Sequence, residues 1–577
     1  MKMRAGEGRW IDLYTPKLVT ILRERYNFSD FRADVIAGMT VAIVALPLSM
    51  AIAIASGVTP DRGLYTAIIG GFLVSLLGGS RFQIGGPAGA FIVLVAGVVH
   101  QYGFDGLILA TMLSGAMLVV VGLLQLGTFI KYIPFPVTVG FTSGIAVIIL
   151  ASQIRDFFGL TLSGAEPGPL VPKLVALGTA LPTINIAATL LSFLTVAVIL
   201  LVRRYQSRWP SMLIAVALAS VIAAILNLPV DTIGSKFGGI PHSLPMPALP
   251  QVSLARVMEV LPAAVAFTLL GSIESLLSAV VGDSMTGRRH RSNCELVAQG
   301  IANIGSALFG GFCVTGTIAR TATNIRAGSH GPVSGMLHSV FLLMFMLVAA
   351  PLASYIPLAA LAGVLVVVAW NMAEKYEFIV LLKTSSGEAV VLLATFLLTV
   401  FRDLTEGIVV GFSLGALLFL HRMAQAVHIR NGMPDVGEDR PDFSDAEQRT
   451  PYDSSLSRDD RIVVYRISGA FFFGAATAVG RTLEQLAEWP KVIIIDFSEV
   501  SIIDSTAAAT ISAFVTKATR GGATIYLTAV SSGVRRYLLA QDVKWPKVHY
   551  RNTIDGALDI ARAKLSNGDD SPPPDEA

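Results

Sequence analysis

Charged side chains are scarce in this sequence of 577 residues. Asp, Glu, Lys and Arg make up 14% of the chain, hydrophobic residues make up 53%, and the mean hydropathy is +0.66. Ordinary soluble proteins carry about 25% charged residues, so a soluble protein of this composition would lack a hydrophilic surface. The composition excludes a wholly soluble chain and is typical of a protein for which lipid is the solvent over most of its length.

Other features are also missing. The 43 basic and 40 acidic residues nearly balance, which gives no reason to expect nucleic-acid binding. The two cysteines, Cys294 and Cys313, lie in apolar stretches and indicate neither a disulfide framework nor a zinc site. No apolar core closely follows the first basic residues, so a signal peptide is not expected. No glycine-rich turn ends in Lys-Ser or Lys-Thr, so ATP is not the expected energy source.

Long apolar runs, by contrast, recur along the chain. Runs of about 20 apolar residues are long enough to cross a bilayer as helices. They predict spans at 33–56, 63–80, 105–126, 131–153, 180–202, 210–228, 256–285, 331–353, 356–374, 385–402 and 404–424. Shorter runs, broken by Gly and Pro, predict three more spans at 86–101, 295–311 and 314–328. The sequence therefore predicts an α-helical polytopic membrane protein with about 14 spans.

Basic residues between the predicted spans indicate the orientation. If both termini are cytoplasmic, five basic groups all fall on the cytoplasmic side, as the positive-inside rule requires. The groups are Arg203, Arg204 and Arg208; Arg288, Arg289, His290 and Arg291; Arg326 and His330; Lys375 and Lys383; and His421, Arg422 and Arg430. This agreement predicts an even number of spans in a cell inner (cytoplasmic) membrane, with one miscounted span as the alternative.

The C-terminal part has a different residue pattern from the apolar spans. Apolar β-branched runs at 462–467, 491–497 and 523–529 alternate with helical stretches near 475–487 and from Ser505, which predicts a small α/β domain with a largely buried sheet. The expected divisions are a cytoplasmic N-terminus at 1–30, a transmembrane domain at 31–428, a polar linker at 429–460, the α/β domain at 461–567 and a disordered tail at 568–577.

Two broken spans occupy matching places. The third span opens with Gly-Gly-Pro-Ala-Gly-Ala at 85–90, and the tenth opens at 310–317 with Gly-Gly-Phe-Cys-Val-Thr-Gly-Thr. Each is third in a half of seven spans, and such pairs point to a transporter's binding site. A helix that starts within the membrane leaves its first N–H groups unpaired and adds a partial positive charge, so two facing starts predict an anion site. The alternative is that these glycines only permit close helix packing.

Ionisable residues inside predicted spans are further site candidates. Glu274 in the eighth span can take up H⁺ or help to bind Na⁺, with Ser278 one turn later available to orient it; the alternative is a carboxyl that serves packing. Arg320 in the tenth span either adds its charge to the anion site or pairs with Glu274. Pro47 breaks the first span, so that Ser49 either lines a cavity or belongs to a packing kink.

These segments resemble a known family. The first span's stretch IAGMTVAIVALPLSMAIAIASGVTPDRGLYTAIIGGFL, the third span's GGPAGA, and the stretch from SIESLLSAVVGDS to TGTIARTATNIRAG are similar to the SulP family of sulfate-permease-like anion transporters, relatives of animal solute carrier family 26. The α/β domain resembles a STAS domain. The resemblance implies 7+7 inverted repeats divided into core and gate domains, an elevator mechanism and a homodimer.

The resemblance also implies site residues. The anion would lie between the half-helices of spans 3 and 10, at Ala88, Gly89, Ala90 and Phe91 and at Thr315, Gly316, Thr317 and Arg320. Glu274 falls where bacterial members carry a coupling acid, and glutamate rather than aspartate there favours protons over Na⁺. The stretch MTGRRHRSNCELVAQG is similar to members associated with C4-dicarboxylates.

The STAS resemblance carries one departure. The family's soluble members start a helix with a phosphorylatable Asp-Ser-Ser/Thr-Gly turn, whereas this chain has Asp504-Ser505-Thr506-Ala507. Alanine in place of glycine favours a structural helix cap at Asp504 or Ser505, with a cytoplasmic regulator as the second option. Dimer contact or folding support is the plainest role for the domain.

Together these features predict a transporter rather than an enzyme, without a metal or organic cofactor. We expect proton-coupled symport of a small anion of the sulfate, bicarbonate or C4-dicarboxylate class. The alternatives are an uncoupled anion exchanger or channel, a Na⁺-coupled bicarbonate symporter, a nucleobase carrier and a membrane-tethered sensor.

Overall fold

The computed structural model describes residues 13–128, 134–164, 166–206, 209–402, 404–425, 428–431, 461–484 and 489–567. The chain divides into two compact units, Met1–Gly415 and Ala416–Ala577, and the division falls within helix α19. Most of the predicted linker, the predicted tail and Arg208 lie outside the described residues.

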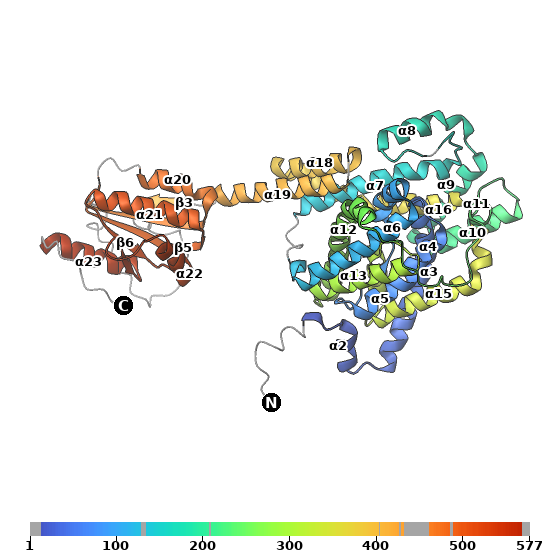
Figure 1. Ribbon diagram of the computed structural model, residues 1–577, viewed down its shortest axis with the longest axis horizontal. Helices are drawn as coiled ribbons and strands as arrows, with labels where there is room; N and C mark the ends of the chain where they lie inside the picture. The colour runs from blue at the N-terminus through green and yellow to red at the C-terminus, as the bar shows by residue number, and fades with distance from the viewer. Residues whose placement is uncertain are drawn as a thin grey trace. The chain divides into compact units, whose positions relative to one another are not determined.

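The first unit is helical (Figure 1). Its elements up to the middle of the unit are α2 (Lys17–Arg23), α3 (Phe28–Ala55), α4 (Pro60–Tyr65), the π-helical turn η1 (Thr66–Gly70), α5 (Gly71–Leu77), β1 (Gly85–Gly86), the 3-10 turn η2 (Gly89–Phe91), α6 (Ile92–Leu123), η3 (Leu126–Thr128), α7 (Phe135–Phe158), α8 (Leu170–Thr179), η5 (Leu181–Thr183), α9 (Ile186–Tyr205), α10 (Ser211–Ile225) and α11 (Ile233–Phe237). They are followed by α12 (Leu254–Thr286), α13 (Ser292–Leu308), β2 (Thr315–Gly316), α14 (Ile318–Arg326), α15 (Val333–Ala353), α16 (Leu358–Met372), α17 (Lys375–Thr384), α18 (Ser386–Phe401) and α19 (Leu404–Gln425).

Every predicted span contains helix. The third and fourth spans share α6, whose backbone leaves the helical region at Gly103 (φ 70°). Eight helices of the described residues are long and apolar enough to cross a membrane, and three shorter apolar helices are α8, α10 and α18. The polytopic helical fold is therefore confirmed, while the count of 14 stays a prediction.

The helices of this unit pack in two groups. Helices α3 to α6 and α12 to α15 contact one another, and α7, α9, α10, α16 and α18 form the second group. Small residues permit close approach in the first group, since a Cβ atom at Gly300 of α13 would lie 2.5 Å from the carbonyl oxygen of Gly115 in α6. This grouping agrees with the division into core and gate domains that the resemblance implies.

The second unit contains an α/β fold. Its elements are β3 (His428–Asn431), β4 (Ile462–Phe471), α20 (Phe473–Glu484), β5 (Val492–Ile503), α21 (Ser505–Arg520), β6 (Thr524–Thr528), α22 (Ser532–Ala540), β7 (His549–Arg551) and α23 (Ile554–Asn567). The strands lie in the order β3-β4-β5-β6-β7; β4 to β7 are parallel, and β3 is antiparallel to β4.

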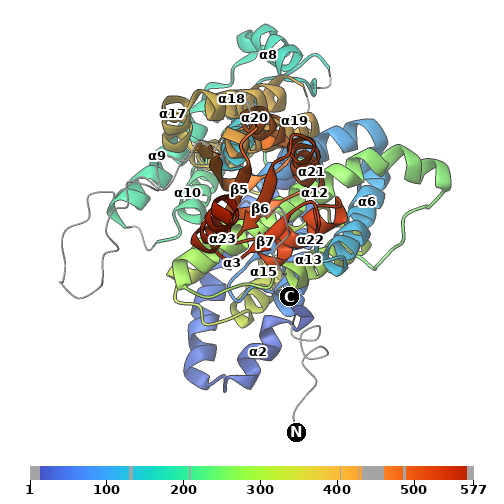
Figure 2. The ribbon, with the colours of Figure 1, turned by 90° about the vertical axis from the view of Figure 1, so that its left-hand side faces the viewer.

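Both faces of this sheet are covered. Figure 2 shows α21 and α22 on one side of the strands and α23 on the other. Alternate residues of β5 point to the two faces: Ile493 and Ile495 pack with the first set of helices, and Ile494 packs with α23. The predicted buried sheet is confirmed, and the sequence missed β3, α22, β7 and α23.

Asp504 is the helix cap that the sequence predicted. Its carboxylate accepts a hydrogen bond from the backbone N–H of Ala507 (2.8 Å) in the first turn of α21. It also accepts one from the N–H of Phe473 (2.9 Å), the first residue of α20. Asp504 therefore fixes the starts of two helices, and the adjacent Ser505 is exposed.

Candidate functional site

A short strand pair joins the two predicted broken spans. Strands β1 and β2 are antiparallel, with Gly85 opposite Gly316 and Gly86 opposite Thr315. The pairing continues through the N–H of Thr317, which donates to the carbonyl oxygen of Ile84 (3.0 Å). Backbone pairing thus brings together two segments 233 residues apart.

A helix begins directly after each strand. The turn η2 starts at Gly89 and leads into α6, while α14 starts at Ile318. Neither preceding residue, Ala88 or Thr317, makes a side-chain capping hydrogen bond. Helix α14 has only nine residues, and α6 breaks at Gly103, so neither segment runs unbroken from its strand across a bilayer. Among the described residues, no side chain accepts a hydrogen bond from the first N–H groups of either helix.

The predicted binding residues differ in exposure. Seven of them are buried: Ala88, Ala90, Phe91, Thr315, Gly316, Thr317 and Arg320. Gly89 is half-buried, and Ile318 and Ala319 in the first turn of α14 are exposed. The accessible residues of this region are therefore Gly89, Ile318 and Ala319 at the two helix starts, and glycine at position 89 permits close approach of a ligand.

Helix α12 contacts both helix starts at Gly271. Thr315 Oγ1 donates to the carbonyl oxygen of Gly271 (3.2 Å). A Cβ atom at Gly271 would lie 3.6 Å from Cζ of Phe91, whose ring also packs against Phe267 with centroids 5.9 Å apart. One helix thus holds the residues that flank both starts, and Phe91 serves this packing from a fully buried position.

Glu274 lies on the same face of α12. Gly271 and Ser278 are one turn before and one turn after it, and Ser278 Oγ lies 3.0 Å from Thr321 Oγ1 of α14. Among the described residues, half-buried Glu274 has no ion pair or hydrogen bond. The structure therefore places Glu274 beside the candidate site, but it pairs Ser278 with Thr321 rather than with Glu274.

Arg320 is buried against the first broken span, with 2% of its surface exposed. Its Nη2 donates to Ser49 Oγ (3.1 Å) and to the carbonyl oxygen of Pro87 (3.3 Å). Its Nη1 packs against Gly86, where a Cβ atom would overlap it. Within the described part of the chain, Nε and Nη1 have no hydrogen-bond partner, and no ion pair joins Arg320 to Glu274. Of the two predicted roles, the pairing with Glu274 is absent from this structure.

Sequence reasoning missed the residue that holds the second strand. Asn303 of α13 donates from Nδ2 to the carbonyl oxygen of Val314 (2.8 Å), and its Oδ1 accepts from the N–H of Val314 (3.0 Å). A signal was present, because Glu295, Gln299 and Asn303 are polar residues four apart in an apolar span. All three are buried, and Glu295 accepts from the N–H of Ser80 (3.0 Å).

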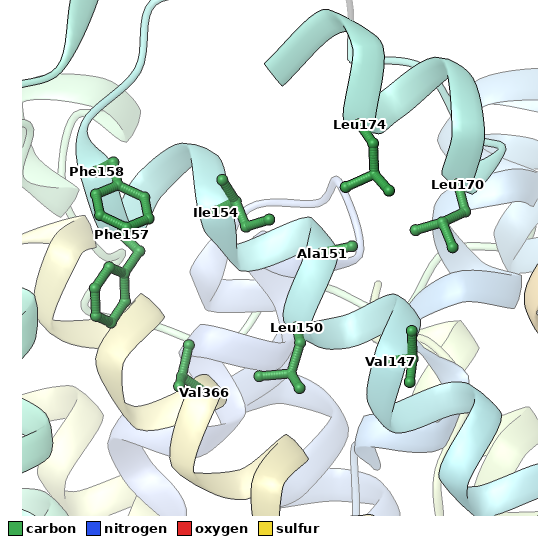
Figure 3. A pocket seen from close by; sticks show the side chains of 9 residues that line it. All are labelled: Val147, Leu150, Ala151, Ile154, Phe157, Phe158, Leu170, Leu174 and Val366. Carbon is green, nitrogen blue, oxygen red and sulfur yellow. The ribbon is translucent and has the colours of Figure 1, made fainter. Parts of the chain in front are cut away.

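A separate apolar groove lies away from these residues. It has a volume of about 360 Å³ between α7, α8 and α16, and its nine lining residues include Leu150, Phe157, Leu174 and Val366 (Figure 3). None of the nine is a predicted site residue, and their side chains offer an anion no hydrogen bond. Across the described residues, no group of three or more His, Cys, Asp or Glu side chains could hold a metal ion.

Comparison with known proteins gives two domain matches. The model of the sulfate permease family matches residues 31–395, and the STAS domain model matches residues 454–557. YvdB of Bacillus subtilis, named as a sulfate transporter, is 39% identical over 515 residues, which are 89% of this chain and 94% of that relative. BicA of Synechocystis sp., a bicarbonate transporter, is 30% identical over 540 residues, or 90% of this chain and 91% of the relative.

A solved structure is similar over almost the whole chain. Murine solute carrier 26 family member A9, an anion transporter in the inward-facing state, matches with a TM-score of 0.82. The match covers 97% of this chain and 96% of that chain. The sequences are 18% identical, so this likeness shows the fold alone.

Proposed function

The chain belongs to the sulfate permease family and is a multi-pass membrane transporter of anions, not an enzyme, and we propose that it carries a small anion by secondary active, proton-coupled symport. One observation carries the proposal. Two helix starts without side-chain caps, at Gly89 and Ile318, are joined by the β1–β2 pair beside buried Arg320, whose Nε and Nη1 have no hydrogen-bond partner among the described residues.

The anion would bind at these helix starts. By the helix dipole, the N-terminus of each of the two helices is equivalent to about half a positive charge. Arg320 supplies a full positive charge, and its Nε and Nη1 are available as charge-assisted donors. Such donors suit sulfate, bicarbonate and C4-dicarboxylates, and the names of YvdB and BicA favour the first two.

Glu274 would couple transport to protons. It lies beside the candidate site, and no cation is paired with it among the described residues. A carboxylate there repels an approaching anion, and a charge within a membrane span is costly, so proton uptake relieves both penalties. The proton and the anion would then bind together, which makes symport the favoured mode.

Access would alternate by movement of the core group of helices past the gate group. Two gate residues border the site, since a Cβ atom at Gly89 would lie 3.6 Å from Cδ1 of Ile149 in α7 and 3.8 Å from Sδ of Met372 in α16. When the core group slides past these apolar gate residues, Gly89 would become accessible from the opposite side of the membrane, as in an elevator mechanism. The proposal also includes a homodimer in the cytoplasmic membrane with both termini inside. It further includes a cytoplasmic regulator that binds the STAS domain.

A substrate panel tests the transport mode. The full-length protein is reconstituted into proteoliposomes, and uptake of labelled sulfate, bicarbonate and succinate is measured with and without an inward proton gradient. We expect one of these anions to accumulate only when the gradient is present. Equal uptake under both conditions would indicate an exchanger or a channel and would refute the symport.

Glu274→Gln tests the coupling residue in the same assay. The amide keeps the shape of the carboxyl but cannot release a proton, so we expect uptake to lose its stimulation by acidic external pH. The control is Glu259→Gln, on the same helix at its start. An unchanged dependence of Glu274→Gln on the gradient would exclude Glu274 as the proton carrier.

A further inference from the structure

A non-helical segment leads into β2. This β2 lead-in, residues 310–314, follows α13 and lies outside any helix or strand. Residues 311–314 are buried, at the opening of the tenth predicted span. A buried N–H or carbonyl group needs a hydrogen-bond partner, and a lipid bilayer supplies none. The backbone of the β2 lead-in must therefore pair with groups of the protein itself.

Helix α4 and the π-helical turn η1 hold the first part of the β2 lead-in. Arg62 Nη1 donates to the carbonyl oxygen of Gly310 (3.0 Å), and Thr66 Oγ1 accepts from the N–H of Phe312 (2.8 Å). The Thr66 hydroxyl also donates to the carbonyl oxygen of Arg62 (2.8 Å), so it acts both as donor and as acceptor. Valine at position 66 would keep the shape of the side chain and leave the Phe312 N–H without this acceptor.

Helix α13 holds the second part of the β2 lead-in. Asn303 donates to the carbonyl oxygen of Val314 (2.8 Å) and accepts from its N–H (3.0 Å), which is the exchange that a residue of a neighbouring antiparallel strand would make. Ser306 Oγ donates to the carbonyl oxygen of Phe312 (2.8 Å). A Cβ atom at Gly311 would overlap Ser306 Oγ, so glycine there leaves room for this hydroxyl. Side chains thus take the place of a second neighbouring strand.

The segment that leads into β1, residues 80–84, is held in the same way. Buried side chains of α13 and α14 pair with its backbone at every second residue: Glu295 with Ser80 (3.0 Å), Asn324 with Phe82 (3.0 Å) and Thr321 with Ile84 (3.2 Å). The last residue held in each segment, Ile84 or Val314, directly precedes its strand. The same pattern in matching places of the two halves indicates a shared requirement for fixed backbone before each strand.

We propose that Thr66 and Asn303 are positioning residues for the anion site. Strands β1 and β2 have two residues each, and so short a pair is too weak to fix its own place. Thr66 and Asn303 fix the β2 lead-in, and through it the start of α14 at Ile318, relative to the start of η2 at Gly89. The donors of the two helix starts then keep the spacing that one anion requires. This inference rests on the proposed function, because it concerns the backbone that would bind the anion.

Thr66→Val tests the positioning role in the proteoliposome assay. Loss of one neutral hydrogen bond changes an equilibrium constant roughly fivefold, and a site that is correctly placed for only part of the time binds more weakly in proportion. We expect the KM for the anion to rise up to roughly fivefold with little change in the maximal rate. Thr66→Ser restores the hydroxyl and should return the KM to the wild-type value. Asn303→Leu loses two hydrogen bonds and should raise the KM further.

Thr195→Val is the matched control for Thr66→Val. The Thr195 hydroxyl is equally buried, but it donates to the carbonyl oxygen of Leu191 (2.8 Å) within α9 of the gate group. We expect the KM of this variant to equal that of the wild type. A KM raised as much in Thr195→Val as in Thr66→Val would show a general effect of losing a buried hydroxyl and would overturn the inference.

Cys313 reports on the β2 lead-in without any transport. It lies within this segment, and its side chain is buried. Maleimide labelling of the full-length protein, with mass spectrometry to distinguish Cys313 from Cys294, measures how readily the segment opens. We expect Cys313 to be labelled up to roughly fivefold faster in Thr66→Val, and faster still in Asn303→Leu, than in the wild type. Thr66→Ser and Thr195→Val should be labelled at the wild-type rate.

The two measurements separate the possible failures. Faster labelling of Cys313 in Thr66→Val with an unchanged KM would show that the segment is held there without placing the anion, and would overturn this inference alone. A raised KM that Thr66→Ser does not restore would also overturn it. Thr66→Val keeps the inference testable if Asn303→Leu does not fold. An unchanged KM in Arg320→Ala would overturn the proposed anion site itself, whatever the labelling of Cys313 shows.

Discussion

Replacement of Arg320 should weaken anion binding by a factor that follows from the number of its hydrogen-bond donors available to the anion. In the part of the chain that the structure describes, Nε and Nη1 have no hydrogen-bond partner, while Nη2 donates to Ser49 and Pro87. A hydrogen bond to a charged group contributes about 1.5–3 kcal/mol. Loss of two such bonds costs about 3 kcal/mol at the lower limit, so Arg320→Ala should raise the anion's dissociation constant roughly 150-fold.

The assay is anion-dependent thermal stabilisation of the full-length protein in detergent, together with the KM of uptake in proteoliposomes. Arg320→Lys keeps the charge but offers a single ammonium, so we expect an intermediate loss. Arg326→Ala is the matched control, because Arg326 is exposed at the other end of the same helix. A loss below threefold in Arg320→Ala would refute the assignment of its donors to the anion.

Three further substitutions test local structure. The buried carboxylate of Asp34 accepts hydrogen bonds from Tyr26 Oη (2.7 Å) and from two backbone N–H groups before α15. Asp34→Ala should therefore reduce the free energy of unfolding by about 3 kcal/mol and lower the unfolding temperature in scanning fluorimetry. An unchanged unfolding temperature would contradict this. Glu24 accepts a hydrogen bond from Arg81 Nη2 (2.5 Å), and this contact lowers the pKa of the Glu24 carboxyl. The ion pair therefore stabilises the fold fully above the ordinary glutamate pKa of about 4.3. This stabilisation is lost as the pH falls through the lowered pKa. Glu24→Gln should therefore be less stable than the wild type at pH 7 and equal to it in acid, and a constant difference would exclude the ion pair. Asp504→Ala should cost about 1 kcal/mol and speed hydrogen exchange at the starts of α20 and α21, while unchanged exchange there would contradict the double cap.

Much of the membrane architecture could be predicted because it depends on apolar length and on glycine. The broken third and tenth spans were visible from their Gly-rich openings, and the structure shows which side chains occupy the space beside these glycines. A Cβ atom at Gly86 would overlap Arg320, and one at Gly316 would overlap the amide of Gln83. Backbone proximity leaves this local signature, which is why the sequence predicted that the openings of the two broken spans lie together.

Side-chain pairing across distant segments leaves no such signature. Ser278 was expected to orient Glu274 because they are four residues apart on one helix, but its hydroxyl makes a hydrogen bond with Thr321 Oγ1 of α14. The clamp of Asn303 on Val314 was missed for the same reason. Spacing along one helix predicts which residues share a face, whereas the partner of that face depends on tertiary packing.

In the α/β domain, too, some elements could be predicted from the sequence and others could not. Its central strands were found because apolar β-branched runs mark a sheet buried on both faces. The three-residue strand β7 carries too short a pattern to be distinguished from a loop. The cap at Asp504 was predicted correctly because capping depends on residues next to one another in the chain.

The two-rung ladder between β1 and β2 has a mechanical consequence. Main-chain hydrogen bonds and the Arg320 contact to Pro87 join the two halves of the candidate site, so neither half can shift alone without breaking several hydrogen bonds, which the membrane interior cannot replace. In the proposed elevator movement, the residues around the bound anion would therefore move as one rigid unit. The anion would consequently bind with the same affinity on both sides of the membrane. The direction of net transport would then have to come from the proton gradient rather than from a change in the residues that bind the anion.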